Sequence, residues 1–238
     1  MIYIKKKGLV IITILILSIM AFVMCFSAIN IISIEGSVSD ITVVLDAGHG
    51  GVDGGVSGRY TKVKESDLNL IITKKVKHNL IKAGINVVLT RSSENGLYGT
   101  ATKNLKRKDM QKRQEIIKKA NPNLVLSIHM NYYSLPSRRG AQVFYKAEDE
   151  ESKTLSLKIQ QSLNSMEEAS RECSILKGDY YLLNCHEYPS ALIECGFLSN
   201  EEDEKLLTSN EYQEKIAYAI FKGIIDYLTI NTSYGFNV

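Results

Sequence analysis

The sequence has almost no net charge once its first residues are set aside. It contains 29 lysine and arginine residues against 26 acidic residues, and Lys5, Lys6 and Lys7 precede every acidic one. Residues 8–238 therefore carry 26 basic and 26 acidic residues. Because a nucleic-acid-binding protein needs a basic surface that neutralises phosphates, this balance argues against nucleic acid as a partner.

Proline is also scarce, and the sequence after Ser39 lacks repeats and low-complexity linkers. The chain has 3 prolines in 238 residues, while 45% of its residues are hydrophobic and 23% are charged. This composition excludes an intrinsically disordered chain. The length allows a single domain after the N-terminal segment.

Charge is missing altogether from Gly8 to Ile34, and Leu9–Ala28 is almost wholly apolar. A helix of about 20 apolar residues can span a bilayer. The lysines at Lys5–Lys7 favour a cytoplasmic N-terminus and an exported remainder. We therefore expect residues 1–36 to form an uncleaved signal-anchor, a transmembrane helix, and residues 37–238 to form a domain on the extracytoplasmic face. A cleaved signal peptide is the alternative.

The exported part alternates between short apolar runs and amphipathic stretches. Apolar runs indicate buried strands, whereas apolar residues that recur every three or four positions indicate helices. The alternation predicts an α/β fold with a mostly parallel, twisted sheet of about six strands and helices on both faces. The expected strands are 41–46, 85–90, 124–128, 140–145, 180–185 and 191–194, and the expected helices are 68–81, 105–120, 150–167 and 212–228.

Unusual polar residues follow three of the expected strands. His49 lies in the glycine-rich stretch Asp46–Gly55, His129 lies within Ser127–Asn131, and Glu194 ends a late apolar run. In sheets of this kind, ligand sites gather beyond the carboxyl ends of the strands. A carboxylate at the end of an apolar run is costly to bury unless it is paired or used in chemistry. The sequence therefore predicts a functional site at this edge of the sheet.

Two of the four histidines in the chain, His49 and His129, fall at these strand ends. A catalytic zinc ion takes three protein ligands, imidazole and carboxylate groups among them, and keeps one position for water. Glu65, just before the first expected helix, is the best candidate for the third ligand. The weaker rivals are Asp46, Asp53 and Asp67. We expect one zinc ion per chain as the cofactor.

The second expected helix carries a dense basic stretch. Such a stretch is usually a solvated face, and binding of an anionic glycan or a partner protein is the functional alternative. Its members are Lys103, Lys106, Arg107, Lys108, Lys112 and Arg113.

Five segments occur in an order and at separations typical of one enzyme family. They are Val44–Gly51, Lys64–Asn69, Val87–Arg91, Ser127–Asn131 and Ala191–Asn200. Together they resemble the zinc-dependent N-acetylmuramoyl-L-alanine amidase family, amidase type 3. The resemblance covers roughly residues 41–228, nearly the whole exported part.

The resemblance implies a role for four residues and an activity. In this family the metal is held by the histidine of the first segment, the glutamate of the second and the histidine of the fourth, which here are His49, Glu65 and His129. The glutamate of the last segment, here Glu194, is the general base. The implied reaction cleaves the amide between the lactyl group of N-acetylmuramic acid and L-alanine of the peptidoglycan stem peptide.

A short, membrane-anchored amidase most resembles the sporulation type, which strips stem peptides from spore-cortex muramic acid so that muramic δ-lactam can form for germination. The expected partners are peptidoglycan, a bacterial membrane through the N-terminal anchor, and an accessory or activating protein. Candidate substrate-binding residues are Asn131, Arg138 and Arg139, and the two arginines follow His129 closely enough to meet peptide carboxylates. Two alternatives remain: a zinc carboxypeptidase-like peptidoglycan peptidase, and a non-catalytic peptidoglycan-binding protein.

Overall fold

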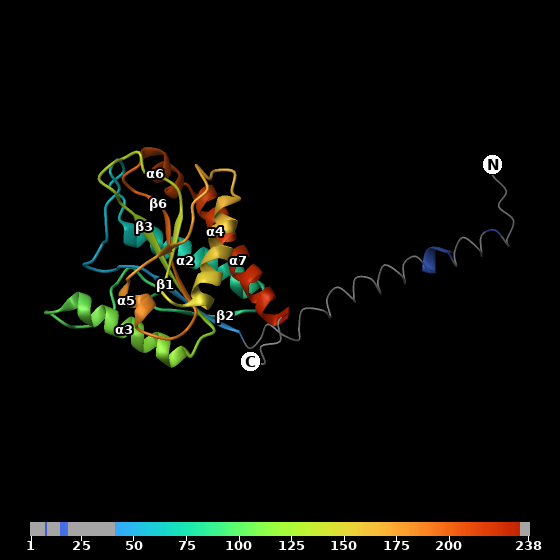
Figure 1. The fold of residues 1–238 in the computed structure, drawn as a ribbon, viewed down its shortest axis with the longest axis horizontal. Coiled ribbons are helices and arrows are strands. Elements are labelled where there is room, and N and C mark those ends of the chain that lie inside the picture. Colours follow the sequence, from blue (N-terminus) through green and yellow to red (C-terminus); the bar gives the residue numbers. More distant parts are fainter. Residues whose placement is uncertain (1–7, 9–14, 19–40, 234–238) are drawn as a thin grey trace. The chain divides into compact units, whose positions relative to one another are not determined.

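The computed structural model describes residues 8, 15–18 and 41–233 (Figure 1). From residue 42 onward the chain alternates strands with helices. The elements are β1 (Thr42–Ala47), α2 (Glu65–Lys82), β2 (Asn86–Leu89), α3 (Leu105–Ala120), β3 (Leu124–Asn131), β4 (Gln142–Tyr145), α4 (Glu150–Asn164), β5 (Leu176–Lys177), α5 (Tyr181–Asn184), β6 (Ser190–Phe197), α6 (Glu201–Leu207) and α7 (Asn210–Ser233).

The strands form one six-stranded sheet in the order β2-β1-β3-β6-β4-β5. The pairs β1–β2, β1–β3, β3–β6 and β4–β5 are parallel, whereas β4 runs antiparallel to β6. The predicted α/β class and six strands are confirmed, but the sheet is mixed. Its one antiparallel pairing arises because the chain returns from β3 to β4 through a loop with no crossover helix.

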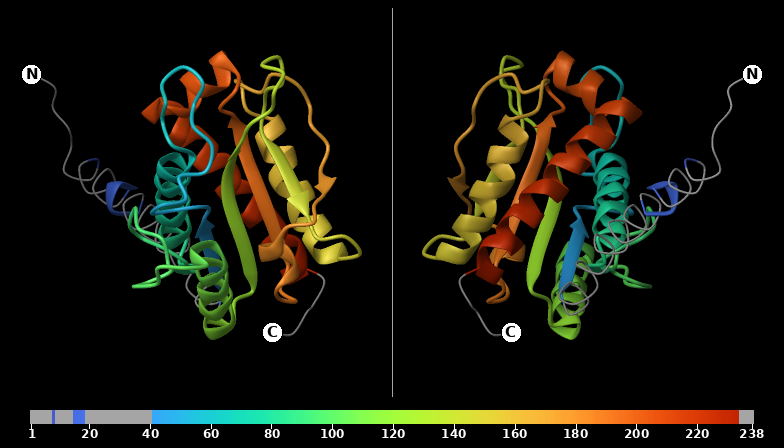
Figure 2. Two further views of the ribbon diagram at one scale, coloured as in Figure 1. Left: turned by 90° about the vertical axis from the view of Figure 1, so that its left-hand side faces the viewer. Right: turned by 90° about the vertical axis from the view of Figure 1, so that its right-hand side faces the viewer.

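Both faces of the sheet are covered, which explains why the central strands are continuously apolar. Helices α2, α4 and α7 pack together on one face, and α3 and α5 cover the other (Figure 2). On the α3 face, Val44 of β1 and Val125 of β3 form a buried cluster with Ile117 of α3 and Leu182 of α5. Side chains alternate along a strand, so Asp46 of β1 points to the same face as Val44.

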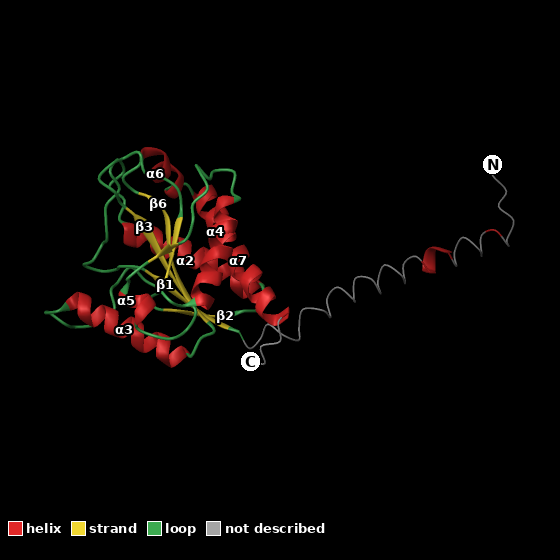
Figure 3. Ribbon diagram, viewed as in Figure 1, coloured by secondary structure: helices red, strands yellow, loops and turns green. Residues whose placement is uncertain are grey.

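One predicted element differs from the observed fold, and two observed elements were not predicted (Figure 3). The expected strand at 180–185 is wrong, because Tyr181–Asn184 forms the short helix α5. A short apolar run does not distinguish a buried strand from a buried helical turn, and here Leu182 and Leu183 are both buried in the helical form. The sequence also did not predict β5, which has only two residues, or α6, which follows β6 after a short turn.

The predicted anchor, residues 1–36, lies outside the described residues except at positions 8 and 15–18. Within the part of the chain that is described, no helix combines the length and apolar character needed to cross a membrane. Contacts divide the chain into Met1–Asp40 and Ile41–Val238, and the second unit contains the whole sheet. The boundary after residue 36 stays a prediction.

Candidate metal centre and active site

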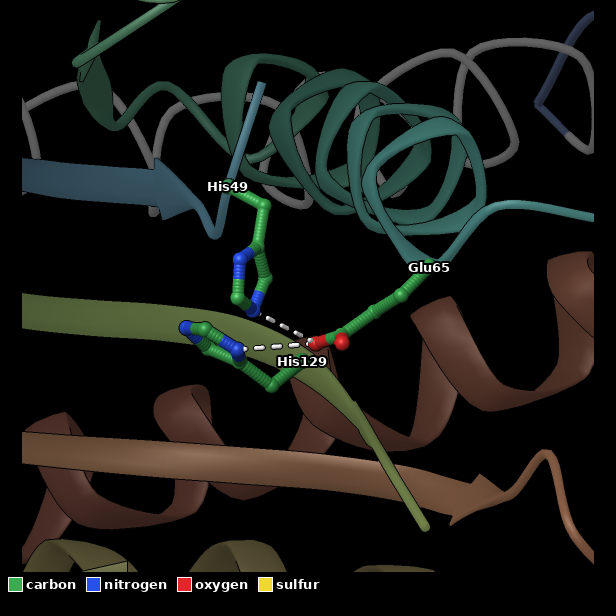
Figure 4. A group of neighbouring side chains, drawn as sticks. All are labelled: His49, Glu65 and His129. Atoms are coloured by element: carbon green, nitrogen blue, oxygen red, sulfur yellow. Dashed lines mark hydrogen bonds and ion pairs between the residues drawn. The ribbon is translucent and has the colours of Figure 1, made fainter. Parts of the chain in front are cut away.

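Three side chains from separate elements converge at the carboxyl edge of the sheet (Figure 4). His49 follows β1, Glu65 is the first residue of α2, and His129 lies in β3. The Glu65 Oε1 atom lies 3.3 Å from His49 Nε2 and 3.0 Å from His129 Nδ1. One ligand atom from each residue fits within a 4.8 Å span, so this group could hold a metal ion. The structure thus brings together the three residues that the sequence singled out as ligands.

Two glycines make room for this convergence. A Cβ atom at Gly48 would lie 2.2 Å from His129 Cε1, so only glycine lets the imidazole ring approach the loop. A Cβ atom at Gly55 would lie 2.4 Å from Glu65 Oε2, and Gly55 has a φ of +66°. His49 itself adopts a φ of 61°, a conformation uncommon for a residue other than glycine. The glycine-rich stretch therefore brings the backbone close to the side chains of both other residues in the group.

Two buried arginines hold this loop by its carbonyl oxygens. Arg91 donates from Nε to the Ala47 carbonyl at 2.8 Å, and its Nη2 donates to Gly48 at 2.9 Å and to Ser66 at 2.8 Å. Arg91 thus ties the residue before His49 to the residue after Glu65. Arg113 of α3 donates to the His49 carbonyl at 2.6 Å. The sequence showed Arg91 only as the end of a family segment and Arg113 only as part of the basic stretch, so their positioning role was missed.

Two of the rival carboxylates have other partners. Asp46 accepts hydrogen bonds from Thr90 and Ser127, both at 2.6 Å, and pairs with Arg113 at 2.5 Å. Asp53 lies 2.9 Å from His49 Nδ1. A carboxylate on the far ring nitrogen is the usual arrangement behind a histidine that ligates a metal, because it fixes the tautomer and the ring orientation.

The group is arranged for a charged carboxylate between two imidazoles. Burial would raise the pKa of Glu65, but hydrogen bonds with His129 and His49 outweigh it and lower that pKa strongly. Burial would lower the pKa of His49, but hydrogen bonds and charge attraction from Glu65 and Asp53 outweigh burial and raise that pKa. Glu65 also accepts hydrogen bonds from the backbone N–H groups of Val56 and Met130. An ionised carboxylate with these neighbours is the form in which glutamate ligates a metal.

Glu194 lies beside this group on the next strand. In the register of β3 and β6 it is the partner of His129, it is 8% exposed, and its Oε2 atom has no hydrogen-bond partner among the described residues. Burial, reinforced by the charge of Glu65 and opposed by His129, raises the pKa of Glu194 to about 7. A buried carboxylate with a free oxygen and a pKa near neutrality suits proton transfer.

A cavity of about 480 Å³ opens over these residues on the α3 face of the sheet. Its walls include His49, Glu65, His129 and Glu194 at the base, the first half of α3 on one side, and Tyr180–Leu182 on another. Asn131 lines the cavity, as expected of a substrate-binding candidate.

The two candidate arginines lie elsewhere. Arg138 stacks over the ring of Tyr133 at 4.8 Å, and Arg139 pairs with Glu202 and Asp203. Both line a separate cavity that contains neither the histidines nor Glu194. The structure does not bring Arg138 and Arg139 to the converging group.

An α/β sheet that presents a His–Glu–His group and a free buried carboxylate in one open cavity has the architecture of a metallohydrolase. A family model described as N-acetylmuramoyl-L-alanine amidase matches residues 43–226. The chain belongs to this amidase family, which confirms the resemblance and the prediction that the chain is an amidase.

Individual relatives agree with this assignment. The chain is 37% identical over 193 residues to the germination-specific N-acetylmuramoyl-L-alanine amidase of Bacillus subtilis (strain 168), with 79% of each protein covered. The structure of the CwlD amidase from Clostridioides difficile in complex with the GerS lipoprotein matches with a TM-score of 0.77 and 40% identity, covering 80% of this chain and 100% of that one. An N-acetylmuramoyl-L-alanine amidase of Clostridium difficile 630 matches with a TM-score of 0.72 and 28% identity, covering 80% and 98%.

Proposed function

We propose that this chain is a zinc-dependent enzyme that hydrolyses the amide between the lactyl group of N-acetylmuramic acid and L-alanine of the peptidoglycan stem peptide. The observation that carries the proposal is the convergence of His49, Glu65 and His129 within 4.8 Å. Membership of the amidase family supports the identity of the bond that is cleaved. The donor set, two imidazoles and one carboxylate, is one that catalytic zinc takes.

Zinc bound by these residues would supply a Lewis acid that activates water and polarises the amide carbonyl at neutral pH. Glu194 accepts a proton from the attacking water and passes it to the departing L-alanine nitrogen. Its free Oε2 atom and its pKa near 7 suit both halves of this transfer. Asp53 lies 2.9 Å from Nδ1 of His49, and the other ring nitrogen, Nε2, lies 3.3 Å from Glu65.

The substrate lies in the cavity, and Asn131, which lines it, is the candidate for binding the stem peptide there. Arg138 and Arg139 remain candidates for binding carboxylates farther along the peptide, because they follow Asn131 in the chain but lie outside the cavity. The spore cortex is the proposed substrate, and cleavage there is a step toward muramic δ-lactam. The similarity to the germination-specific amidase of Bacillus subtilis supports this choice.

An accessory protein and a membrane location complete the proposal. The similar amidase from Clostridioides difficile was solved in complex with the GerS lipoprotein, which supports an accessory partner. Residues 1–36 anchor the enzyme as an uncleaved signal-anchor, and residues 37–238 act on the extracytoplasmic face. The charge-free stretch from Gly8 to Ile34 behind Lys5–Lys7 supports this location.

Product analysis with two variants tests the proposed reaction. Wild-type enzyme should release stem peptides that begin with L-alanine, whereas a carboxypeptidase-like enzyme would shorten the stems. Glu194→Gln should keep its zinc and lose at least about a hundredfold in turnover, since general-base catalysis contributes that much. Glu65→Ala should lose both zinc and turnover. An active Glu194→Gln enzyme would contradict the assigned role, and wild-type protein that binds peptidoglycan without releasing peptides would favour a non-catalytic binding protein.

A further inference from the structure

The charge of residues 8–238 is balanced in total but not in distribution. The segment 103–119, which contains most of α3, carries eight basic residues and two acidic ones. The rest of residues 8–238 therefore carries 18 basic and 24 acidic residues. The sequence-wide balance hides one strongly basic helix in an otherwise acidic protein.

Most of this basic charge is exposed and unpaired. Arg113 and Asp109 form a buried ion pair, so together they add no net charge to the surface of α3. The side chains of Lys103, Lys106, Arg107, Lys108 and Lys112 are all exposed, and we call these five residues the basic face of α3. Within the part of the chain that is described, only one of them forms an ion pair, Lys112 with Glu115.

The position of these charges is unfavourable for the helix itself. A helix N-terminus carries a partial positive charge that favours acidic side chains in the first turn. The first turn of α3 has no acidic residue, and Asn104 at its N-cap makes no side-chain capping bond. An anion brought by a ligand would relieve this repulsion and meet the free backbone N–H groups.

The basic face reaches the active-site cavity at one residue, Lys106. Lys106 lines the cavity together with Leu105 and Met110 of the same helix. The α3 helix lies on the face of the sheet that carries the site (Figure 2). A polymer whose cleaved bond lies in the cavity must continue past its walls, and α3 forms one of them. Peptidoglycan stem peptides carry free carboxylates, so the substrate has the charge that complements this wall.

We propose that the basic face of α3 is a second contact surface for peptidoglycan, which binds carboxylates of stem peptides beside the one being cleaved. The proposal rests on the proposed function for the identity of the polymer. It assigns the basic face to holding the polymer rather than to cleaving it. Binding of intact peptidoglycan should therefore depend on these charges and on salt, and hydrolysis of a small soluble substrate should not.

The test compares a triple variant with a charge-matched control. Lys103→Gln, Arg107→Gln and Lys108→Gln together remove three charges of the basic face and spare Lys106, which lines the cavity. The control removes three exposed lysines of α2 and α7, on the other face of the sheet, by Lys74→Gln, Lys82→Gln and Lys222→Gln. Each protein is the full chain in neutral detergent micelles and carries Glu194→Gln for the binding measurement, so that the polymer is not consumed.

Co-sedimentation with purified peptidoglycan stripped of phosphate-containing wall polymers gives the first measurement. The triple variant should bind about tenfold more weakly than the parent in low salt, as expected for three exposed charges, and it should lose most of the salt dependence. The control should bind like the parent. Peptidoglycan whose carboxylates have been amidated should bind the parent as weakly as the triple variant binds untreated polymer.

Turnover of soluble N-acetylmuramoyl-dipeptide, measured with Glu194 restored, separates this proposal from the proposed function. The triple variant should match wild type within about twofold, because it leaves the cavity intact. The proposal is overturned if the triple variant and the parent sediment equally with peptidoglycan. If the triple variant then also binds micelles doped with phosphatidylglycerol more weakly than the parent does, α3 faces a membrane instead. Equal losses in the triple variant and the control would also overturn the proposal. If the wild-type enzyme did not hydrolyse the soluble N-acetylmuramoyl-dipeptide, the result would count against the proposed function alone.

Discussion

At the scale of single residues, the candidate metal centre depends on positions that have no side chain. The His129 ring occupies the space that a Cβ atom at Gly48 would fill, at 2.2–2.7 Å from three of its ring atoms. The carboxylate of Glu65 fills the corresponding space at Gly55. The glycines between Asp46 and Gly55 are therefore part of the ligand geometry and not only a flexible loop.

This contact leads to a prediction for Gly48→Ala. The added methyl group must displace the His129 ring, so zinc affinity should fall by about 10–100-fold, the range seen when groups that orient metal ligands are removed. The fold should remain, which far-UV circular dichroism would show, while equilibrium dialysis measures zinc.

Gly54→Ala is the matched control for this substitution. A Cβ atom at Gly54 would lie 3.4 Å from Lys64 Cδ, an ordinary contact with a flexible side chain. This variant should bind zinc like wild type. If Gly48→Ala bound zinc as tightly as Gly54→Ala, the argument from close approach would be wrong.

Motif positions indicated His49, Glu65, His129 and Glu194 from the sequence because each residue type has a direct chemical use. The role of Arg91 was not readable in this way. Its guanidinium contacts backbone carbonyls from two distant segments, and such contacts leave no pattern of spacing in the sequence. Arg138 and Arg139 lie close to His129 in sequence but line a separate cavity, because closeness in sequence does not by itself set the position of a loop side chain.

At the scale of elements, one buried ion pair joins α3 to the central strands. Arg113 of α3 and Asp46 of β1 are 2% exposed at their side chains and lie 2.5 Å apart. Asp46 also accepts a hydrogen bond from Ser127 of β3. Burial would raise the pKa of Asp46, but Arg113 and the hydroxyls of Ser127 and Thr90 outweigh it and lower that pKa.

Asp46→Asn should therefore destabilise the domain. The substitution removes one of the two carboxylates that pair with the buried Arg113, which keeps Asp109, so the cost should be about 1–3 kcal/mol at pH 7. The folded-state pKa of Asp46 lies below its unfolded value of about 3.9, so its stabilisation is present above that pH and is lost as the pH falls below it. Urea unfolding at pH 7 and at pH 3 should show a large difference from wild type at pH 7 and a smaller one at pH 3.

The exposed Asp226 of α7 provides the control, and Asp226→Asn should change the free energy of unfolding by less than about 0.5 kcal/mol. If the Asp46→Asn protein were as stable as this control at pH 7, the ion pair between Asp46 and Arg113 would not stabilise the packing of α3 on the sheet.

The sequence predicted correctly whether a segment is a helix or a strand where the apolar pattern was long. The helix at Leu105–Ala120 and the strand beginning at Leu124 have the predicted positions. The run at 180–185 was too short to show a period, and burial of Leu182 against Val44 and Val125 is satisfied by a helical turn as well as by a strand. The two-residue β5 exists only through its pairing with β4, which is a tertiary contact that local sequence does not contain.

At the scale of the whole molecule, sheet order determines where the chemistry lies. Strands β1, β3 and β6 are neighbours, so the residues at their carboxyl ends meet although they lie far apart in the chain. Figure 4 shows the two histidines pointing at the Glu65 carboxylate from the loop after β1 and from β3. The sequence could predict a common edge from the alternation of strands and helices. It could not predict that β4 pairs with β6, because no local pattern specifies that partner, although the lack of a predicted helix between residues 128 and 140 already indicated an antiparallel direction for β4.

The central claim is that His49, Glu65 and His129 hold a zinc ion that the amidase activity requires. The most direct measurement is the metal content of the purified full chain together with stem-peptide release before chelation, after chelation and after zinc is restored. We predict about one zinc per chain, loss of peptide release on chelation, recovery with zinc, and no bound zinc in His129→Ala. Unchanged peptide release from chelated, zinc-free protein would contradict the account.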